Sequence, residues 1–411
     1  MNRYRVGRFF WAALSIFAAA TILSGISHAA GYKRVYNFGA GSDGSRVSSS
    51  MTFDSAGNAY GTTATGGDFD LGTVFMITPT GEEQVLWSFT GGDDGSYPYG
   101  GVILDAQGNL YGTAGSGGTG GFCSGNGCGV VFELMPVSGS WDEVTLYNFT
   151  GHDDGYSPGS PLIFDNAGNL YGTTPDGGAH GYGVVFELSP TQSGWELKVI
   201  HAFTGKKEGG VGSLGSLLFD AAGNLYGTTE VGGPWAGGSV YELSPTSHGP
   251  WKISVLYDFK GTPDAAAPYG GLISDSDGNL YGTTYFGGQY GYGTVFQLSH
   301  GLNGAWQENV LHNFQDGTDG GYPTATLLFD GVSTLYGTTQ DGGRPSCDCG
   351  TVFSLRFSRG QWQEKLLHVF GKGHDGSYPN YGLAFDPSGH LWGTTPAGGT
   401  AGQGTIFQLT P

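Results

Sequence analysis

The chain has 411 residues, of which 80 are glycine, 16 are Lys or Arg and 35 are Asp or Glu. Disordered chains are poor in aromatic residues and rich in charge, and helical bundles tolerate few glycines. The 14% aromatic content and the abundance of glycine therefore exclude both classes. Collagen needs a three-residue glycine period, which is absent, so an all-β protein with many tight turns remains.

The first 29 residues have the features of a secretory signal peptide. Arg3, Arg5 and Arg8 precede an apolar run from Phe9 to Ile26, and small residues at Ser27 and Ala29 form a cleavage site. An uncleaved membrane anchor is the alternative interpretation, because the apolar run approaches the length that spans a bilayer. We predict a secreted or periplasmic protein, exported by the general secretion route since no twin-arginine pair is present.

The charge balance restricts the partners of the mature chain. Cleavage after Ala29 would remove three arginines and no acid, which leaves 13 basic and 35 acidic residues and a net charge of −22. Such a chain repels nucleic acid and anionic lipid. We expect no nucleic-acid partner and no membrane contact after cleavage, and we expect partners that are neutral, cationic or bridged by a metal ion.

One phrase of the form GNLYGTT recurs seven times after the predicted signal peptide. Each copy lies in a repeat of about 55 residues with four short runs of β-branched and aromatic residues, such as LIFD at 162–165 and VVFEL at 184–188. Four strands in a repeat of this length are typical of a β-propeller blade. Residues 30–411 are therefore predicted to form one all-β domain, a seven-bladed β-propeller with four antiparallel strands per blade. The aromatic residue of the phrase stands at Tyr60, Tyr111, Tyr171, Tyr226, Tyr281, Tyr336 and Trp392.

The order of the runs predicts how the ring closes. The first run, 34–38, matches the fourth strand of a repeat, and the last run, 405–409, matches the third. If the strand that ends in Asp is innermost, the N-terminal strand completes the last blade and removes an open sheet edge. The alternative is seven uninterrupted blades without this closure. We favour closure, because the tight D-x-x-G-N turn belongs between adjacent strands of one blade.

Several repeated residues are interpreted as structural. The Asp that ends each first strand can accept hydrogen bonds from the backbone of the following turn, which we favour over a functional carboxylate ring. Five tryptophans that open the fourth strand are expected to pack between neighbouring sheets. His201, His312 and His368 replace Tyr or Trp at one position of the fourth strand, so a packed imidazole is predicted there. The tryptophans are Trp141, Trp195, Trp251, Trp306 and Trp362.

A second acidic position lies in the loops that join one blade to the next. Three interpretations stay open: ordering of the loop, calcium binding, since hard cations prefer clustered oxygen ligands, and direct binding of a sugar or a cationic partner. No stretch matches the twelve-residue calcium loop. The seven acids are Asp43, Asp94, Asp154, Glu208, Asp264, Asp319 and Asp375.

Strand alternation places these loops on the same face as the loops between the second and third strands. Those second loops carry paired glycines, and many aromatic side chains accompany them, so this face is predicted to bind the ligand. His152, His180 and His374 fall on the same face, but no catalytic spacing recurs and no catalytic residue is assigned. The aromatic residues predicted to bind are Tyr97, Trp235, Tyr290, Tyr322 and Tyr378.

Four cysteines occur in two close pairs, in equivalent loops of the second and sixth repeats. The two loops are expected to lie roughly 30 Å apart, whereas a disulfide needs Cα atoms within about 7 Å, so pairing between the loops is excluded. Cys123 and Cys128 are predicted to form a local disulfide in an oxidising compartment. For Cys347 and Cys349, a disulfide would close a very small ring, and their state stays open.

The repeats resemble the GloVer tandem-repeat family of exported bacterial proteins. The matching phrases are NLYGTTPDGGAHGYGVVFELSP at 169–190 and FTGGDDGSYPYGGVILD at 89–105. The resemblance covers essentially the whole mature chain and implies export and a repeat fold, with no catalytic residues to transfer. Members often carry a C-terminal sorting anchor, and we expect none here, because Pro411 directly follows a predicted strand.

These observations predict an exported propeller that acts as a binding scaffold for polysaccharide or a cell-surface partner. No cofactor is expected apart from calcium at the acidic loops. One alternative is a carbohydrate-active enzyme, a lyase or hydrolase with its site at the channel mouth, which would need a suitably spaced pair of carboxylates. A structural envelope protein is the other alternative.

Overall fold

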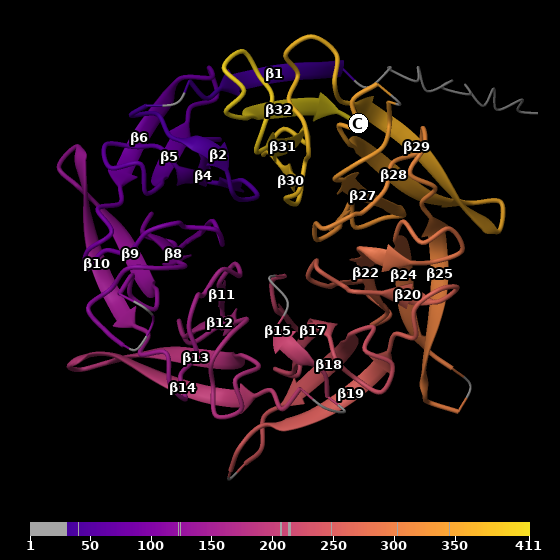
Figure 1. Ribbon diagram of the computed structural model, residues 1–411, viewed down its shortest axis with the longest axis horizontal. Helices are drawn as coiled ribbons and strands as arrows, with labels where there is room; N and C mark the ends of the chain where they lie inside the picture. Colours follow the sequence, from indigo (N-terminus) through magenta and orange to yellow (C-terminus); the bar gives the residue numbers. More distant parts are fainter. Residues whose placement is uncertain are drawn as a thin grey trace, which may run out of the picture.

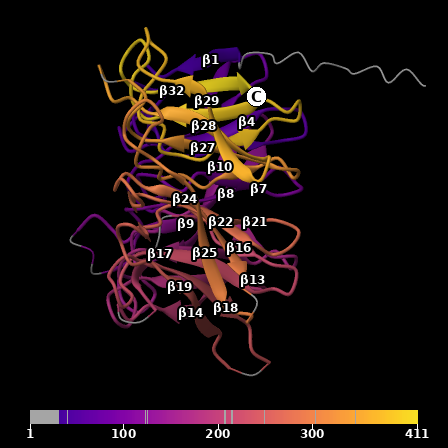
Figure 2. The same cartoon turned by 90° about the vertical axis from the view of Figure 1, so that its right-hand side faces the viewer.

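The computed structural model describes residues 31–411 except 40, 122, 124, 206, 207, 213, 214, 248, 302 and 345. The predicted signal peptide, residues 1–29, lies outside the described residues. Seven antiparallel sheets surround a central axis, and in the first six the four strands of the blade follow one another in sequence order (Figure 1). The predicted seven-bladed propeller is confirmed. In the side view, loops project from both faces of the disc (Figure 2).

The strands take equivalent places in every blade. The innermost strands are β3 (Thr52–Phe53), β7 (Val102–Leu104), β11 (Ile163–Phe164), β16 (Leu218–Phe219), β21 (Ile273–Ser274), β26 (Leu328–Phe329) and β30 (Ala384–Phe385). The second strands are β4 (Ala59–Thr65), β8 (Leu110–Ala114), β12 (Leu170–Thr174), β17 (Leu225–Val231), β22 (Leu280–Thr284), β27 (Thr334–Thr339) and β31 (Leu391–Thr395).

The third and outer strands are longer on average. The third strands are β5 (Thr73–Ile77), β9 (Val130–Val137), β13 (Val184–Thr191), β18 (Ser239–Ser244), β24 (Thr294–His300), β28 (Thr351–Ser358) and β32 (Thr405–Thr410). The outer strands are β6 (Glu83–Ser88), β10 (Ser140–Asn148), β14 (Gly194–Ala202), β19 (Lys252–Asp258), β25 (Trp306–Asn313), β29 (Gln361–Val369) and β1 (Gly31–Asn37). Four short strands lie in loops: β2 (Ser45–Val47), β15 (Gly210–Gly212), β20 (Ala265–Ala266) and β23 (Phe286–Gly287).

The N-terminal strand closes the ring as predicted. Strand β1 pairs antiparallel with β32, and their register runs from Gly31 opposite Thr410 to Asn37 opposite Thr405. The last sheet therefore has the order β1-β32-β31-β30, with the first strand of the chain outermost (Figure 1). Because β1 pairs with the outer side of β32, the third strand of the last blade is not left as an unpaired sheet edge.

The core lies between neighbouring sheets. The Phe that follows each outer strand packs edge-on against an aromatic ring in the third strand of the next blade. Phe149 and Phe186 are one such pair, and the seven centroid distances fall between 5.1 and 5.4 Å. Gly172 of β12 leaves room for its cross-strand partner Phe186, since a Cβ there would lie 2.6 Å from the ring. The predicted tryptophan packing is confirmed as well, with Trp195 6.4 Å from Tyr111 of the preceding blade.

The repeated Asp that ends each first strand orders the following hairpin. Asp165 accepts backbone hydrogen bonds from Ala167 and Asn169 with one oxygen, and bonds from the Asn169 amide and the Tyr171 hydroxyl with the other. Burial alone raises the pKa of this carboxyl, but these donors outweigh it and hold the pKa below the usual value. The structural interpretation of these residues is confirmed.

Candidate functional site

The loops that join the blades lie on one face, which we call the loop face. Each of these loops pairs with the segment after the second strand of the next blade. Ser96 pairs with Ser116 and Tyr156 with Asp176, while β2, β15 and β20 form equivalent pairings. The two loop sets therefore emerge together, as the strand alternation predicts.

A left-handed residue recurs in these joining loops, usually just before a proline. Tyr97 has φ of 58°, and Ser157, Ala267, Tyr322 and Tyr378 have values between 55° and 61°. Positive φ is unfavourable for a residue with a Cβ and persists only where the surroundings impose it. The backbone of these loops is thus set by its surroundings.

A pocket of about 640 Å³ occupies the centre of the loop face, and residues from all seven blades line it. We call it the central pocket. Its wall contains the tyrosines Tyr97, Tyr99, Tyr269 and Tyr381, together with serine, threonine, glycine and proline residues. Among the described residues, none that lines it is charged. The small polar members are Ser49, Ser50, Ser116, Ser157, Ser216, Thr324, Thr326 and Asn380.

Three of the tyrosines are held by specific contacts. The rings of Tyr97 and Tyr99 stack 6.3 Å apart at an angle of 14°. The Tyr269 hydroxyl donates a 2.7 Å hydrogen bond to the carboxylate of Glu230. Burial raises the pKa of Tyr269, and the bond to Glu230 raises it further, so this hydroxyl stays protonated. The pocket therefore presents fixed, neutral aromatic faces.

The seven acids predicted as binding residues lie around the ring, one at each blade junction. Six of them accept a backbone N–H hydrogen bond within their own loop, whereas Asp319 lies 3.5 Å from His312. Asp94 accepts bonds from the Thr90 backbone N–H and hydroxyl and from the Trp87 indole, and Asp154 repeats this pattern. Asp94 is only 6% exposed. Asp43, Glu208, Asp264 and Asp375 likewise accept a bond from the backbone N–H four residues earlier. Among the described residues, no three Asp, Glu, His or Cys side chains form a metal-binding group.

Four glutamates on outer strands face these acids, a feature that the sequence analysis missed. Burial, reinforced by the charge of Asp264 and a bond to it, raises the pKa of Glu308 to about 9. Burial raises the pKa of Glu83, Glu143 and Glu364 to about 7, with contributions from Asp43, Asp94 and Asp319. On each of these outer strands, the glutamate lies four residues before the Trp, Tyr or His ring that contacts a junction acid. This constant spacing is the sequence signal that could have identified the glutamates.

The aromatic residues predicted to bind do not form one surface. Tyr97 lines the central pocket. Tyr322 belongs to a separate cluster, 5.0 Å from Tyr285 and in contact with Phe286 and Tyr292. Trp235, Tyr290 and Tyr378 are exposed, Trp235 by 61%.

Three carboxylates accompany the Tyr322 cluster. Burial raises the pKa of Asp341 to about 6, and the nearby charges of Asp348 and Asp316 contribute. The pKa of Asp316 is also raised, first by burial and then by Asp348 and Asp319. A carboxyl whose pKa is raised toward neutrality keeps its proton in mildly acidic solution and is suited to proton donation there.

The family model for the Gloeobacter/Verrucomicrobia repeat matches residues 119–253 and 213–411. The chain belongs to this family. The predicted resemblance to GloVer repeats is thus confirmed over residues 119–411. No curated protein shows significant sequence similarity to the chain.

Solved structures similar to this GloVer protein are distant propellers. The extracellular domain of a proposed one-component system from B. thetaiotaomicron has 12% identity and a TM-score of 0.56, over 92% of this chain and 40% of that one. A proposed oxidoreductase (glucose dehydrogenase) from Thermus thermophilus has 14% identity and a TM-score of 0.45, over 93% of this chain and all of its own. At 12% identity the likeness to the extracellular domain shows the fold alone.

The three histidines of the outer strands of this GloVer protein are packed side chains, as predicted. Nε2 of His368 donates a 3.0 Å bond to the Asp375 carboxylate, and His201 and His312 lie 3.9 and 3.5 Å from Glu208 and Asp319. Each ring packs edge-on against the Phe two residues later. Burial lowers the pKa of all three, although the neighbouring acids oppose it.

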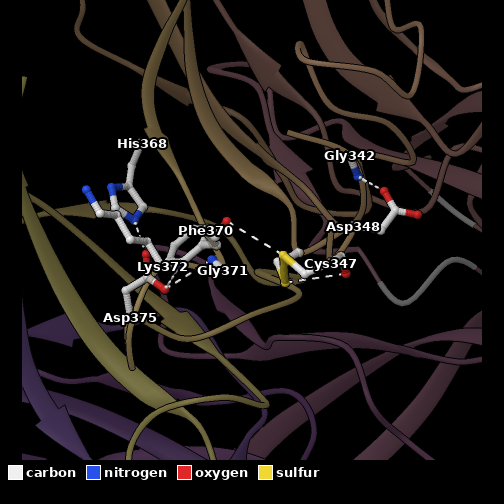
Figure 3. Close-up of a disulfide and its surroundings, with 9 residues drawn as sticks. Gly342, Cys347, Asp348, His368, Phe370, Gly371, Lys372 and Asp375 are labelled. Atoms are coloured by element: carbon white, nitrogen blue, oxygen red, sulfur yellow. Dashed lines mark hydrogen bonds and ion pairs between the residues drawn. A yellow bond between two sulfur atoms is a disulfide. The ribbon is translucent and has the colours of Figure 1, made fainter. Parts of the chain in front are cut away.

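Both cysteine pairs form local disulfides. The predicted bond between Cys123 and Cys128 is confirmed, and Cys347 is bonded to Cys349. In the second pair, Cys347 also contacts the Phe370 carbonyl across the loop (Figure 3).

In the described parts of residues 31–411, no helix has the length and apolar character needed to cross a membrane.

Proposed function

We propose that this GloVer protein is an exported carbohydrate-binding propeller whose central pocket holds a neutral polysaccharide. The observation that carries the proposal is the composition of the pocket wall: tyrosine rings and hydroxyl groups from seven blades, and no charged side chain. Sugars offer apolar C–H faces that suit aromatic rings, and hydroxyls that suit Ser, Thr and Asn partners.

Rigidity supports this proposal. The left-handed turn at Tyr97 and the Glu230 bond at Tyr269 fix two rings before any ligand arrives. Little side-chain entropy is then lost on binding, which favours affinity in a shallow site. The volume of about 640 Å³ is within the range of small-ligand sites and matches a short oligosaccharide.

Charge supports a neutral ligand at this place. The chain carries 35 acidic against 16 basic residues, so an acidic polymer would be repelled on approach. Uncharged plant and microbial polysaccharides meet no such barrier.

Co-sedimentation and affinity electrophoresis with a panel of neutral and acidic polysaccharides test the proposal. The protein should be retained by at least one neutral polymer, and Tyr99→Ala and Tyr269→Ala should each weaken binding about tenfold or more, as expected for anchoring aromatic residues. Phe357→Ala, an exposed aromatic residue that does not line the pocket, is the matched control and should bind normally. Retention by no polymer, or equal binding by all variants, would reject the proposal.

A second function, glycoside cleavage, is favoured by Asp341. Its pKa of about 6 beside Asp316 and Asp348, close to the Tyr322 cluster, suits a general acid. The same panel should then release reducing or unsaturated ends, and Asp341→Asn should abolish release without loss of polymer binding. Retention without products would leave the protein a binding scaffold.

A further inference from the structure

A second pocket, of about 560 Å³, lies at the junction where the ring closes. We call it the rim pocket. The outer strand β29 of the sixth blade forms one side and the N-terminal strand β1 forms the other. Arg34, Arg344, Lys372 and His374 all line it. Three full positive charges in one pocket are notable in a chain where acids outnumber bases by about two to one.

The single carboxylate in the rim pocket is engaged elsewhere. One oxygen of Asp375 is bonded to His368, and the other accepts the backbone N–H groups of Gly371 and Lys372 (Figure 3). Among the described residues, no ion pair within 4.0 Å involves Arg34, Arg344 or Lys372. Within the part of the chain that the structure describes, these three basic side chains therefore have no acidic partner at ion-pair distance.

Arg34 is oriented by a hydrogen bond, and both arginines have donors left for a ligand. Arg34 donates a 2.7 Å bond from Nη1 to the His374 carbonyl, which orients its guanidinium and leaves other N–H groups available. The Nε of Arg344 is buried and has no hydrogen-bond partner in the described part of the chain. An unpaired buried guanidinium donor is costly, and an anionic oxygen would satisfy it.

The basic residues break the symmetry of the repeats. At the position of Arg344, after the paired glycines, the other six loops carry Asp68, Thr119, Ala179, Pro234, Gln289 and Thr400. At the position of Lys372, the other six junctions carry Ala40, Gly91, Gly151, Gly205, Gly261 and Asp316. At the position of Arg34, the other outer strands carry Val85, Thr145, Val199, Val255, Val310 and Leu366. A structural requirement of the blade would recur in every repeat, and these charges occur at one junction only.

We propose that the rim pocket binds the oxyanion group of a ligand, a carboxylate, sulfate or phosphate, between Arg34, Arg344 and Lys372. Guanidinium groups bind such anions through paired, charge-assisted hydrogen bonds, and the ammonium group adds a point charge. The site is separate from the central pocket, and the inference does not depend on carbohydrate binding there.

Thermal shift titrations of the full chain with sodium sulfate, phosphate and acetate, at constant ionic strength set with chloride, test this proposal. At least one anion should give a saturable rise in melting temperature. Arg344→Gln and Lys372→Gln should weaken that response about tenfold, the effect of losing one charge-assisted bond. Sulfate also stabilises proteins without binding a site. The comparison between the parent and the pocket variants therefore distinguishes binding in the rim pocket from this general effect.

Arg359→Gln and Lys252→Gln remove exposed basic residues outside the pocket and serve as controls. A response to sulfate and phosphate alone would identify a tetrahedral anion, and a response to acetate a carboxylate. If Arg344→Gln does not fold, the exposed Lys372 still provides a variant. The proposal is overturned if no anion gives a saturable shift, or if the pocket variants respond like the controls.

Discussion

Tyr32 of the first strand stacks on His368 of the sixth blade, with ring centroids 4.0 Å apart and an angle of 12° between the planes. The Tyr32 hydroxyl also donates a 2.6 Å bond to the Asp375 carbonyl in the loop that leads to the last blade. One side chain near the N-terminus thus connects the closing strand, the preceding blade and the joining loop. In four other blades the equivalent position is a glutamate facing the junction acid.

We expect Tyr32→Ala to destabilise the ring at this junction. The change removes a stacked aromatic pair and a hydrogen bond, which together contribute about 1–3 kcal/mol to the free energy of unfolding. Tyr32→Phe removes only the bond and should cost about 1 kcal/mol. Urea unfolding followed by tryptophan fluorescence measures both values. Tyr290→Ala, at an exposed tyrosine, is the control, and an equal effect there would contradict a closing role for Tyr32.

The hairpin aspartates are predicted to be stabilising in each blade. Asp165→Ala leaves the N–H groups of Ala167 and Asn169 without their acceptor, and the expected loss is about 1–3 kcal/mol. Asp142→Ala, at an exposed outer-strand position, should stay within about 0.5 kcal/mol of the parent. Chemical denaturation of the two variants side by side gives the comparison. A similar midpoint for both would show that the turn does not need the carboxylate.

Stability is predicted to fall as the pH rises above about 5, because of the buried glutamates. Their folded pKa values lie above the unfolded value of 4.5, so the stability that they contribute is complete below that value. This stabilising contribution is lost as the pH rises through the folded pKa values. These values are about 7 for Glu83, Glu143 and Glu364 and about 9 for Glu308. The three packed histidines act in the other direction, since their lowered pKa values remove stability as the pH falls below 6.5.

Glu308→Leu isolates this effect. Leu197 and Ile253 occupy the same position in two other blades, so the junction accommodates an aliphatic side chain. We expect the stability of the variant to decline less than that of the parent between pH 5 and 9. Its free energy of unfolding at pH 8 should be higher by on the order of 1 kcal/mol. Melting curves across this range, with Glu196→Leu as an exposed control, measure the change. An unchanged pH profile would show that Glu308 is ionised in the folded protein.

The fold was predictable because its determinants are local and repeated. The D-x-x-G-N turn at Asp165 and the outer-strand pattern of residues 34–38 were enough to count the blades and to predict the closure. The central pocket was only partly predictable. Tyr97 was identified from its loop, but Ser216 and Thr326 carry no signal of their own and line the pocket only because seven loops converge.

The rim pocket could not be found from the sequence for a related reason. Arg34 and Arg344 belong to opposite ends of the chain, and only the closing strand brings them to one pocket. The junction acids show the opposite case, since a conspicuous repeated pattern orders six of the seven loops through bonds such as Asp94 with Thr90. Binding by these acids and by Trp235, Tyr290 and Tyr378 stays a prediction.

Reduction of the Cys347–Cys349 disulfide is expected to weaken the oxyanion response of the rim pocket. The bond lies in the loop that carries Arg344, and Cys347 contacts the Phe370 carbonyl, next to the Gly371 and Asp375 loop on the other side of the pocket (Figure 3). Without the bond the loop gains conformational freedom, and ordering Arg344 on binding costs more entropy. We therefore predict that a Cys347→Ser, Cys349→Ser variant needs several-fold more anion for half of the thermal shift. The matched Cys123→Ser, Cys128→Ser variant lacks the other disulfide, in the second blade, and should respond like the parent. An equal response in all three proteins would show that the disulfide does not position Arg344.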